Sequence, residues 1–294
     1  DAGYGLILLF LSVFFLRKIW GKMGTTFAIC GVATVFMGWL TGGWFGNILY
    51  NESYGLGLSF FKAVWSDPLE NPIPLLSLSL EMGIAHLLLG HVTAIMASAR
   101  RGRLKQGLLA HGGWCLTLVF GSIFILWYMN MVSVSPLWRT LSTWGLAVGV
   151  VLGMTGYIWE RSGSGRIAAP AQFMYDILGH VADVISYSRL LALGISTGVN
   201  AFLIDMIIVG IVWPGVPKAG IVGAVVSVVA AVVLAIGFVL LHLVNMGLNS
   251  LSGFVHTMRL HFAEYFGKFY EGGGEEFRPF KASRTITSLA QDGG

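Results

Sequence analysis

Arg189 is the residue whose type and position most need a chemical explanation. It lies inside an apolar run from Pro170 to Trp213, about 29 Å from one end and about 36 Å from the other if the run is helical. A guanidinium stays protonated under all ordinary conditions and cannot easily reach either end of the run from there. Placing it in the middle of a membrane-spanning helix costs on the order of 3 kcal/mol. The sequence therefore predicts that Arg189 has a partner or a function at membrane depth.

Polar residues near Arg189 divide between two helix faces. At about 100° per residue, Ser186, Ser196 and Asn200 share the face of Arg189. The opposite face carries Asp176, His180, Asp183 and Asp205. Two interpretations follow. Either an acid on a neighbouring helix neutralises Arg189 in a structural ion pair, or the basic face binds a carboxylate transiently. In the second interpretation, the acidic face lines a water-filled path for cations.

The composition predicts an all-α integral membrane protein. Hydrophobic residues make up 55% of the chain and charged residues 11%, and the mean hydropathy is +0.76. All but the first of the apolar segments reach the roughly 20 residues that a bilayer requires. The seven segments are 3–20, 23–46, 74–98, 106–131, 137–159, 170–213 and 219–266. We expect a polytopic bundle of about seven transmembrane helices, with glycines such as Gly38, Gly42 and Gly46 at close helix contacts.

Lys and Arg alternate between the two sides of the predicted membrane. Thirteen follow the first, third, fifth and last segments, whereas the other connections hold only Lys62, Arg139 and Lys218. By the positive-inside rule, the thirteen face the cytoplasm. Asp1 is then outside and the C-terminus cytoplasmic. So abrupt a start at an outer loop predicts that a further part of the protein precedes Asp1.

The last two segments are unusually long. As straight helices they would measure about 66 and 72 Å, twice the hydrocarbon core, so we expect strong tilt or extension into water. The connection 213–218 supplies the turn between them. A second polar stripe within an arc of about 80° on the last segment contains Asn245, Asn249, Ser252, His256 and Arg259. Counted from that turn, straight antiparallel helices would separate Arg189 from Arg259 by roughly 24 Å in depth. If the two act together, the last segment must be bent, or part of 219–241 must lie outside the simple hairpin.

Three stretches carry a family resemblance: the opening DAGYGL, SYSRLLALGIS at 186–196, and FVHTMRLHFAEYFGKFYEGGGEEFRPF at 254–280. Together they resemble the membrane domain of the large stator subunit of V-type and archaeal or bacterial A-type rotary ATPases, called subunit I in prokaryotes and subunit a in eukaryotes. The resemblance covers nearly the whole chain, in order.

The resemblance implies a multi-pass protein of the prokaryotic plasma membrane. The family has an N-terminal stalk-binding domain and eight membrane helices, so this chain would hold helices two to eight. We expect a peripheral helix bundle at 1–160, a long tilted helix pair facing a rotor ring at 161–270 and a cytoplasmic tail at 271–294. One implied partner is a ring of small subunits that each carry a membrane carboxylate. The others are subunits of the peripheral stalk and subunits associated with the central stalk, which would bind through the absent N-terminal domain. No cofactor, metal or nucleic acid is expected.

The resemblance also implies roles for individual residues. Arg189 and Arg259 match the two membrane arginines of the family, and Asp176 falls at, or one residue from, a half-channel glutamate. We expect Asp176, His180 and Asp183 to line the cytoplasmic path of a coupled proton flow that drives ATP synthesis, or is driven by hydrolysis. Relatives often carry an acid where this chain has Asn249, which is a departure. The outer path is assigned to Asp205, His242, Asn245 and Glu81, although a structural hydrogen bond is an equal alternative for Glu81.

Other classes of function remain as alternatives. A secondary ion transporter or channel would also bury an arginine, but the chain shows no internal repeat. A metalloenzyme could use histidines, yet no HExxH pair occurs, and His86 and His91 point about 140° apart on a helix. Packing or interfacial hydrogen bonding is the default role for the remaining histidines, including His111. The chain has no Walker-type loop, so any nucleotide must bind elsewhere in an assembly.

Overall fold

The computed structural model describes residues 1–53, 55–128, 135–161, 165–217, 219–270 and 272–273. Its helices are α1 (Ala2–Leu11), α2 (Arg17–Trp20), α3 (Lys22–Thr41), α4 (Ile73–Arg100), α5 (Leu104–Tyr128), α6 (Pro136–Glu160), α7 (Gly165–Ser186), α8 (Ser188–Asp205) and α9 (Gly220–Arg259). Three π-helical segments extend them: Ser12–Leu16, Met206–Val212 and Leu260–Tyr265. No strand occurs in these ranges.

The helices confirm the predicted fold class. Seven helical stretches in the described residues are long and apolar enough to cross a membrane: Ala2–Trp20, Lys22–Thr41, Ile73–Arg100, Leu104–Tyr128, Pro136–Trp159, Gly165–Val212 and Gly220–Lys268. They match the seven apolar segments of the sequence nearly end to end. The chain is therefore an all-α polytopic membrane protein. Most of the predicted tail, 274–294, lies outside the described residues.

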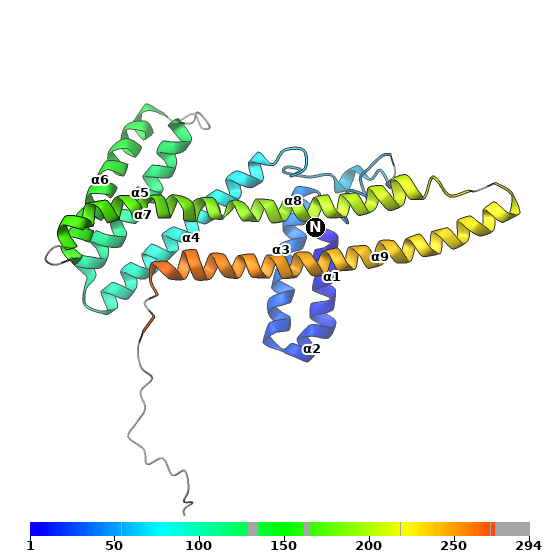
Figure 1. Ribbon diagram of the computed structural model, residues 1–294, viewed down its shortest axis with the longest axis horizontal. Helices are drawn as coiled ribbons and strands as arrows, with labels where there is room; N and C mark the ends of the chain where they lie inside the picture. The colour runs from blue at the N-terminus through cyan, green and yellow to red at the C-terminus, as the bar shows by residue number, and fades with distance from the viewer. Residues whose placement is uncertain (54, 129–134, 162–164, 218, 271, 274–294) are drawn as a thin grey trace, which may run out of the picture.

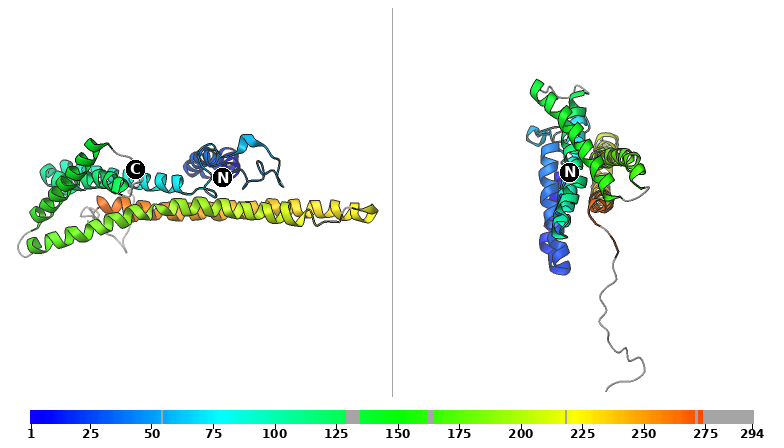
Figure 2. Two further views of the ribbon diagram at one scale, coloured as in Figure 1. Left: turned by 90° about the horizontal axis from the view of Figure 1, so that it is seen from above. Right: turned by 90° about the vertical axis from the view of Figure 1, so that its left-hand side faces the viewer.

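The two long helical stretches form a layer of their own. Figure 1 shows α7 and α8 running side by side with α9 along the whole length of the molecule, crosswise to α1 and α3. Viewed from above in Figure 2, the other helices all lie on one side of this pair. The opposite side of the pair is bare in the described structure. Its exposed side chains include Val225, Val229, Val233, Leu240, Leu248 and Leu251.

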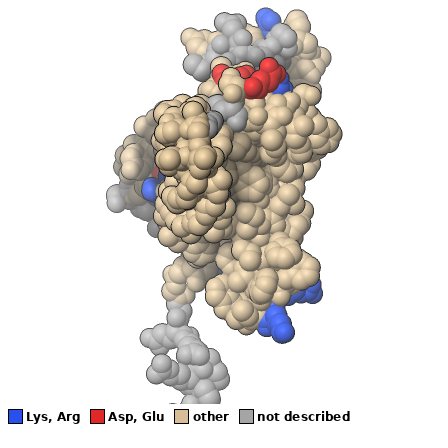
Figure 3. Space-filling model, turned by 90° about the vertical axis from the view of Figure 1, so that its right-hand side faces the viewer, with Lys and Arg blue, Asp and Glu red and all other residues tan. Residues whose placement is uncertain are grey.

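Charged groups gather at the ends of the helices. In Figure 1, two segments lie on the lower side of the molecule: α2, which contains Arg17 and Lys18, and the α4–α5 connection. The connection before α4 lies on the upper side. Figure 3 shows Lys and Arg atoms at the lower end, and Asp and Glu atoms together with further Lys or Arg atoms near the upper end, with a broad face of other residues between the two ends. This separation suits a chain whose middle lies in hydrocarbon.

The glycine prediction is partly wrong. Gly38 does lie at a helix contact, because a Cβ there would stand 2.1 Å from the Ala2 backbone nitrogen. However, α3 ends at Thr41, and Gly42 follows it with a left-handed φ of 74° as the helix cap. Gly46 also has a positive φ, 71°, and lies in the loop. Gly46 still lies at a close helix contact, because a Cβ there would stand 2.9 Å from the Ala201 carbonyl carbon on α8. The spacing of four residues therefore combines one glycine packed within a helix with two in a turn, one of which also packs against α8.

The depth difference that straight antiparallel helices joined by a tight turn would require between the two arginines is not found. Two contacts set how α7–α8 lies against α9 and its extension: Asp205 contacts His242, and Asp183 contacts Lys268. Interpolation between these two pairs places Arg189 level with about residue 261. Arg189 is then about 3 Å from Arg259, measured along the axis of the helix pair. The simple count failed because the connection after Val212 is no tight turn. Figure 1 shows it running onward, parallel to the first turns of α9. The two arginines thus lie at similar levels.

Close backbone contact joins α5 to α6, and one glycine provides a test of it. A Cβ at Gly113 would stand 2.3 Å from the Gly153 backbone nitrogen, whereas a Cβ at Gly112 would meet nothing within 4 Å. We expect Gly113→Ala to push the helices apart and to lower the free energy of unfolding by about 1–3 kcal/mol. Thermal unfolding in detergent measures this, with Gly112→Ala as the matched control. Equal midpoints for both variants would contradict the packing.

Candidate ion-translocation site

Arg189 has no partner in the part of the chain that the structure describes. The residue is half-buried near the start of α8, and its Nη1 atom is buried without a hydrogen-bond acceptor among the described residues. The ion pair that would make Arg189 purely structural is therefore not found there. A buried guanidinium nitrogen left in this state is costly, so the site calls for an acceptor from elsewhere.

A cavity of about 300 Å³ lies against α7, on the N-terminal side of Arg189. We call it the histidine cavity. Its lining includes His91, His111, Tyr157, Asp176, His180, Asp183 and Lys268. The structure thus brings the three residues predicted for the cytoplasmic path, Asp176, His180 and Asp183, to one cavity. It adds four polar side chains from α4, α5, α6 and the end of the chain's last helical stretch.

Hydrogen bonds order the side chains of the histidine cavity. His180 Nδ1 lies 2.8 Å from the Asp176 carbonyl oxygen and must donate to it. With all three rings neutral, His180 Nε2 then accepts from His91 Nε2 at 3.0 Å, and His91 Nδ1 accepts from His111 Nδ1 at 3.3 Å. The arrangement is a directed row of imidazoles from α5 through α4 to α7.

The carboxylates of the histidine cavity are held by their own partners. The Tyr157 hydroxyl donates to Asp176 at 2.5 Å. Lys268 Nζ donates to Asp183 at 2.5 Å, and both of these side chains are largely buried. Hydrogen bonds to the charged form stabilise a carboxylate in such a place. The cavity therefore combines anchored acids with a hydrogen-bonded row of imidazoles.

A second cavity, of about 450 Å³, lies on the C-terminal side of Arg189. We call it the loop cavity, because the connection after α3 forms one wall. That wall includes Gly42, Gly43, Gly46, Tyr50 and Asp67. The long helices form another part of the lining. From α8 come Leu190, Leu191, Leu193, Gly194, Thr197 and Gly198, and from α9 come Asn249 and Gly253. Along the α7–α8 helix, the histidine cavity ends at Asp183 and the loop cavity begins at Leu190. Arg189 stands between the two.

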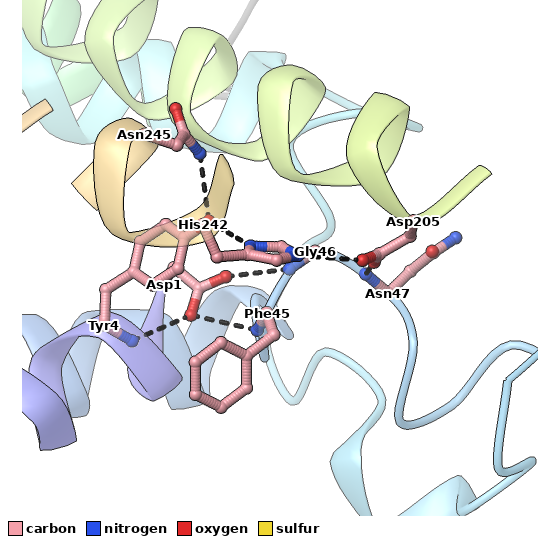
Figure 4. A network of polar contacts seen from close by, with 8 residues as sticks. All are labelled: Asp1, Tyr4, Phe45, Gly46, Asn47, Asp205, His242 and Asn245. Carbon is pink, nitrogen blue, oxygen red and sulfur yellow. Dashed lines mark hydrogen bonds and ion pairs between the residues drawn. The ribbon is translucent and has the colours of Figure 1, made fainter. Parts of the chain in front are cut away.

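A third polar group joins α1 to the long helix pair, and we call it the junction network. Figure 4 shows its members converging from α1, the loop after α3, α8 and α9. The Tyr4 hydroxyl lies 2.6 Å from His242 Nδ1 and accepts from Asn245 at 3.0 Å. His242 Nε2 lies 3.2 Å from Asp205, whose other oxygen accepts from the Asn47 backbone at 3.1 Å.

The junction network contains three of the four residues predicted for the outer path. Asp205 is fully buried, and His242 and Asn245 are each 5% exposed. None of the three lines the histidine cavity or the loop cavity. Asn245 nevertheless leads to the loop cavity, because Asn249, which lines it, donates to the Asn245 side chain at 2.7 Å.

The remaining predicted residues lie outside these groups. Glu81 is exposed on α4, and no polar contact of it is found among the described residues. Ser196, Asn200 and Arg259 are exposed, and Ser186, Ser252 and His256 are half-buried. The acidic face of α7–α8 thus packs against the other helices, while the face of Arg189 is largely open. Among the described residues, no group of three or more His, Cys, Asp or Glu could hold a metal ion.

Sequence reasoning missed several members of the polar groups. Sequence reasoning weighs His91 only as a metal ligand, assigns His111 to packing or interfacial hydrogen bonding, and gives Tyr157 and Lys268 no part in the site. They belong to helices whose contacts with α7 a single sequence does not specify. Tyr4 had a signal, since it stands in the DAGYG opening, where Asp1 accepts from the Tyr4, Phe45 and Gly46 backbones at 3.2, 3.0 and 2.9 Å.

Comparison with known proteins agrees with the resemblance. Residues 175–282, which include both arginines, match the model of the V-type ATPase 116kDa subunit family. An A-type ATP synthase subunit I of Methanocaldococcus jannaschii is 30% identical over 316 residues, covering 98% of this chain and 43% of the relative. The same-named protein of Pyrococcus horikoshii is 28% identical over 297 residues, covering 98% of this chain and 41% of the relative.

This chain belongs to the V/A-type ATPase subunit I family. It spans less than half the length of these curated relatives. Family membership and seven apolar helices together identify a multi-pass membrane protein.

The junction network provides a direct test, because one hydroxyl serves two partners in it. Tyr4→Phe would leave His242 Nδ1 and the Asn245 amide without their partner. We expect a loss of about 1–3 kcal/mol in the free energy of unfolding, since a buried polar group left unpaired is costly. Thermal unfolding in detergent measures the loss. Tyr128→Phe, at a residue 73% exposed, is the control, and an equal response in both variants would argue against the network.

Proposed function

We propose that this chain is the membrane stator of a rotary V/A-type ATPase or synthase, in which Arg189 meets the carboxylates of a rotor ring one after another. The observation that carries the proposal is the place of Arg189. It stands between two cavities that lie on opposite sides of it along one helix, and it has a buried nitrogen without an acceptor in the described structure. A passing carboxylate is the acceptor that this position fits.

The mechanism is electrostatic. A ring carboxylate in lipid must be neutral, because a lone anion there is too costly. Close to Arg189 the charged form is favoured, so the carboxylate releases its proton at that point. Arg189 cannot be deprotonated, so its charge also stops protons from passing straight between the two cavities. Protons must therefore travel around with the ring.

The two cavities are the two half-channels in this proposal. The histidine cavity carries Asp176, His180 and Asp183 and is the cytoplasmic path. The loop cavity, with Asp67 and Asn249 in its lining, is the outer path, and the junction network borders it through Asn245. Each proton that crosses gains or loses about 2.3 kcal/mol per 100 mV of membrane potential. Rotation couples this free energy to ATP synthesis, or hydrolysis drives the reverse flow.

The uncovered side of the long helix pair is the ring contact in this proposal. It carries Arg189, Ser196 and Asn200 together with the apolar side chains of α9. Residues 161–270 thus form the motor surface, and 1–160 the supporting bundle. The stalk subunits would attach through a preceding domain, with the C-terminus in the cytoplasm.

Coupled pumping tests the proposal. We expect Arg189→Lys to abolish ATP-driven proton pumping by the complete complex in vesicles while assembly stays intact, because an ammonium lacks the planar fork that pairs with a carboxylate. A pH-sensitive dye inside the vesicles gives the rate. Arg259→Lys and Asp176→Asn serve as comparisons, and Arg103→Lys, in the exposed α4–α5 connection, as the control. Near-normal pumping by Arg189→Lys would end the stator proposal.

A further inference from the structure

Glu264 is a buried carboxylate that the proposed mechanism does not yet use. It is 4% exposed, and its Oε2 atom has no hydrogen-bond partner among the described residues. The residue lies in the π-helical segment Leu260–Tyr265 that follows α9, and such segments occur frequently at functional sites. A permanently charged carboxylate in that position would be costly, whereas one that is protonated for part of a cycle is far less so.

Glu264 lies at the level between the histidine cavity and Arg189. Lys268, one turn further along, contacts Asp183 at the edge of that cavity. The pairing of the two long helices places Glu264 level with about residues 186–187. Tyr187 interacts electrostatically with both Glu264 and Asp183. The Glu264 carboxylate therefore lies beyond the Asp183 edge of the histidine cavity, on the side toward Arg189 and close to its level along the helix pair.

The surroundings of Glu264 are aromatic and closely packed. Tyr187 is 3% exposed and its hydroxyl lies 2.6 Å from His86 Nδ1 on α4. The His86 ring stacks on the Tyr265 ring at 4.3 Å. Gly83 admits Tyr187, since a Cβ there would stand 2.7 Å from the tyrosine ring. These walls contain two groups able to carry a proton, the His86 imidazole and the Glu264 carboxylate. Of the two, His86 already bonds the Tyr187 hydroxyl, whereas Glu264 keeps a buried oxygen without a partner among the described residues.

A gap in the proposed path shows why such a group is needed. The histidine cavity reaches Asp183 but not Arg189, and these two residues are six positions apart, which is about 9 Å along the helix. Direct proton transfer requires a heavy-atom separation of about 2.6–3.2 Å, or one intervening water. A proton therefore needs a further donor and acceptor between Asp183 and the ring.

We propose that Glu264 carries protons between the histidine cavity and the ring carboxylate near Arg189, an inference that rests on the proposed function. In one direction, the Glu264 carboxylate takes a proton from a hydronium ion or an imidazolium in the cavity, which leaves water or a neutral imidazole, and Glu264 becomes a neutral acid. It then gives the proton to a ring carboxylate, which becomes neutral and can enter lipid, and Glu264 returns to its charged form. The opposite direction reverses both transfers.

The test uses the complete complex in vesicles with Glu264→Gln and Glu264→Asp. We expect ATP-driven proton pumping to fall on the order of 100-fold in Glu264→Gln, with assembly intact. Glu264→Asp keeps a titratable carboxyl and should restore a clear part of the rate. Glu70→Gln, at an exposed carboxylate in the connection before α4, is the control and should pump normally.

The outcomes separate this inference from the proposed function. If Arg189→Lys abolishes pumping but Glu264→Gln pumps normally, the stator proposal stands and the role of Glu264 is wrong. Equal losses in the Gln and Asp variants would also overturn it, because the carboxyl would then matter only for packing. Failure of both variants to assemble, while Glu70→Gln assembles, would assign Glu264 a structural role and would overturn it too.

Discussion

A guanidinium that cannot lose its charge, placed far from both ends of a long apolar helix, is the constraint on which the rest of this structure depends. Inside hydrocarbon such a group needs an acceptor. The described part of the chain offers none to the Arg189 Nη1 atom, and the side of the helix pair that carries Arg189 is left open. An acceptor that arrives from outside resolves both facts.

The polar groups around Arg189 have different kinds of partner. The junction network is closely hydrogen-bonded, and its buried Asp205, His242 and Asn245 line neither cavity, which suits a device that fixes how α8 and α9 lie against α1. The histidine cavity instead holds anchored acids beside a directed row of imidazoles around an open volume. Fixed geometry in the first group keeps the two arginines at similar levels, and the second is the cytoplasmic path in the function that we propose.

Much of this architecture could be predicted from the sequence. Seven apolar segments gave the helices almost to the residue, because hydrophobic length directly reports bilayer spans. The division of polar residues between two faces of 170–213 also held, since α-helix geometry alone determines it. Asp176, His180 and Asp183 share one cavity for the same reason.

The way in which the helices lie against one another could not be predicted from the sequence. The axial offset of α8 and α9 depends on an extended connection that a residue count treats as a turn. The contacts of His91, His111 and Tyr157 with α7 depend on how four helices pack together. Glycine spacing did not show that Gly42 and Gly46 lie in the turn after α3, because the same residue suits both a close helix contact and a left-handed φ. Glu264 carried no signal until its burial was known.

The central claim is that the open face of α8, with Arg189, lies against a rotating ring of carboxylate-bearing subunits. Disulfide cross-linking tests it most directly, with a cysteine in place of Ser196, an exposed residue on that face, and a second cysteine beside the ring carboxylate in the complete complex. The account predicts a cross-link that forms in high yield, stops ATP-driven rotation and is reversed by reductant. A Ser196→Cys thiol that never cross-links to the ring, while the complex remains assembled and active, would contradict it.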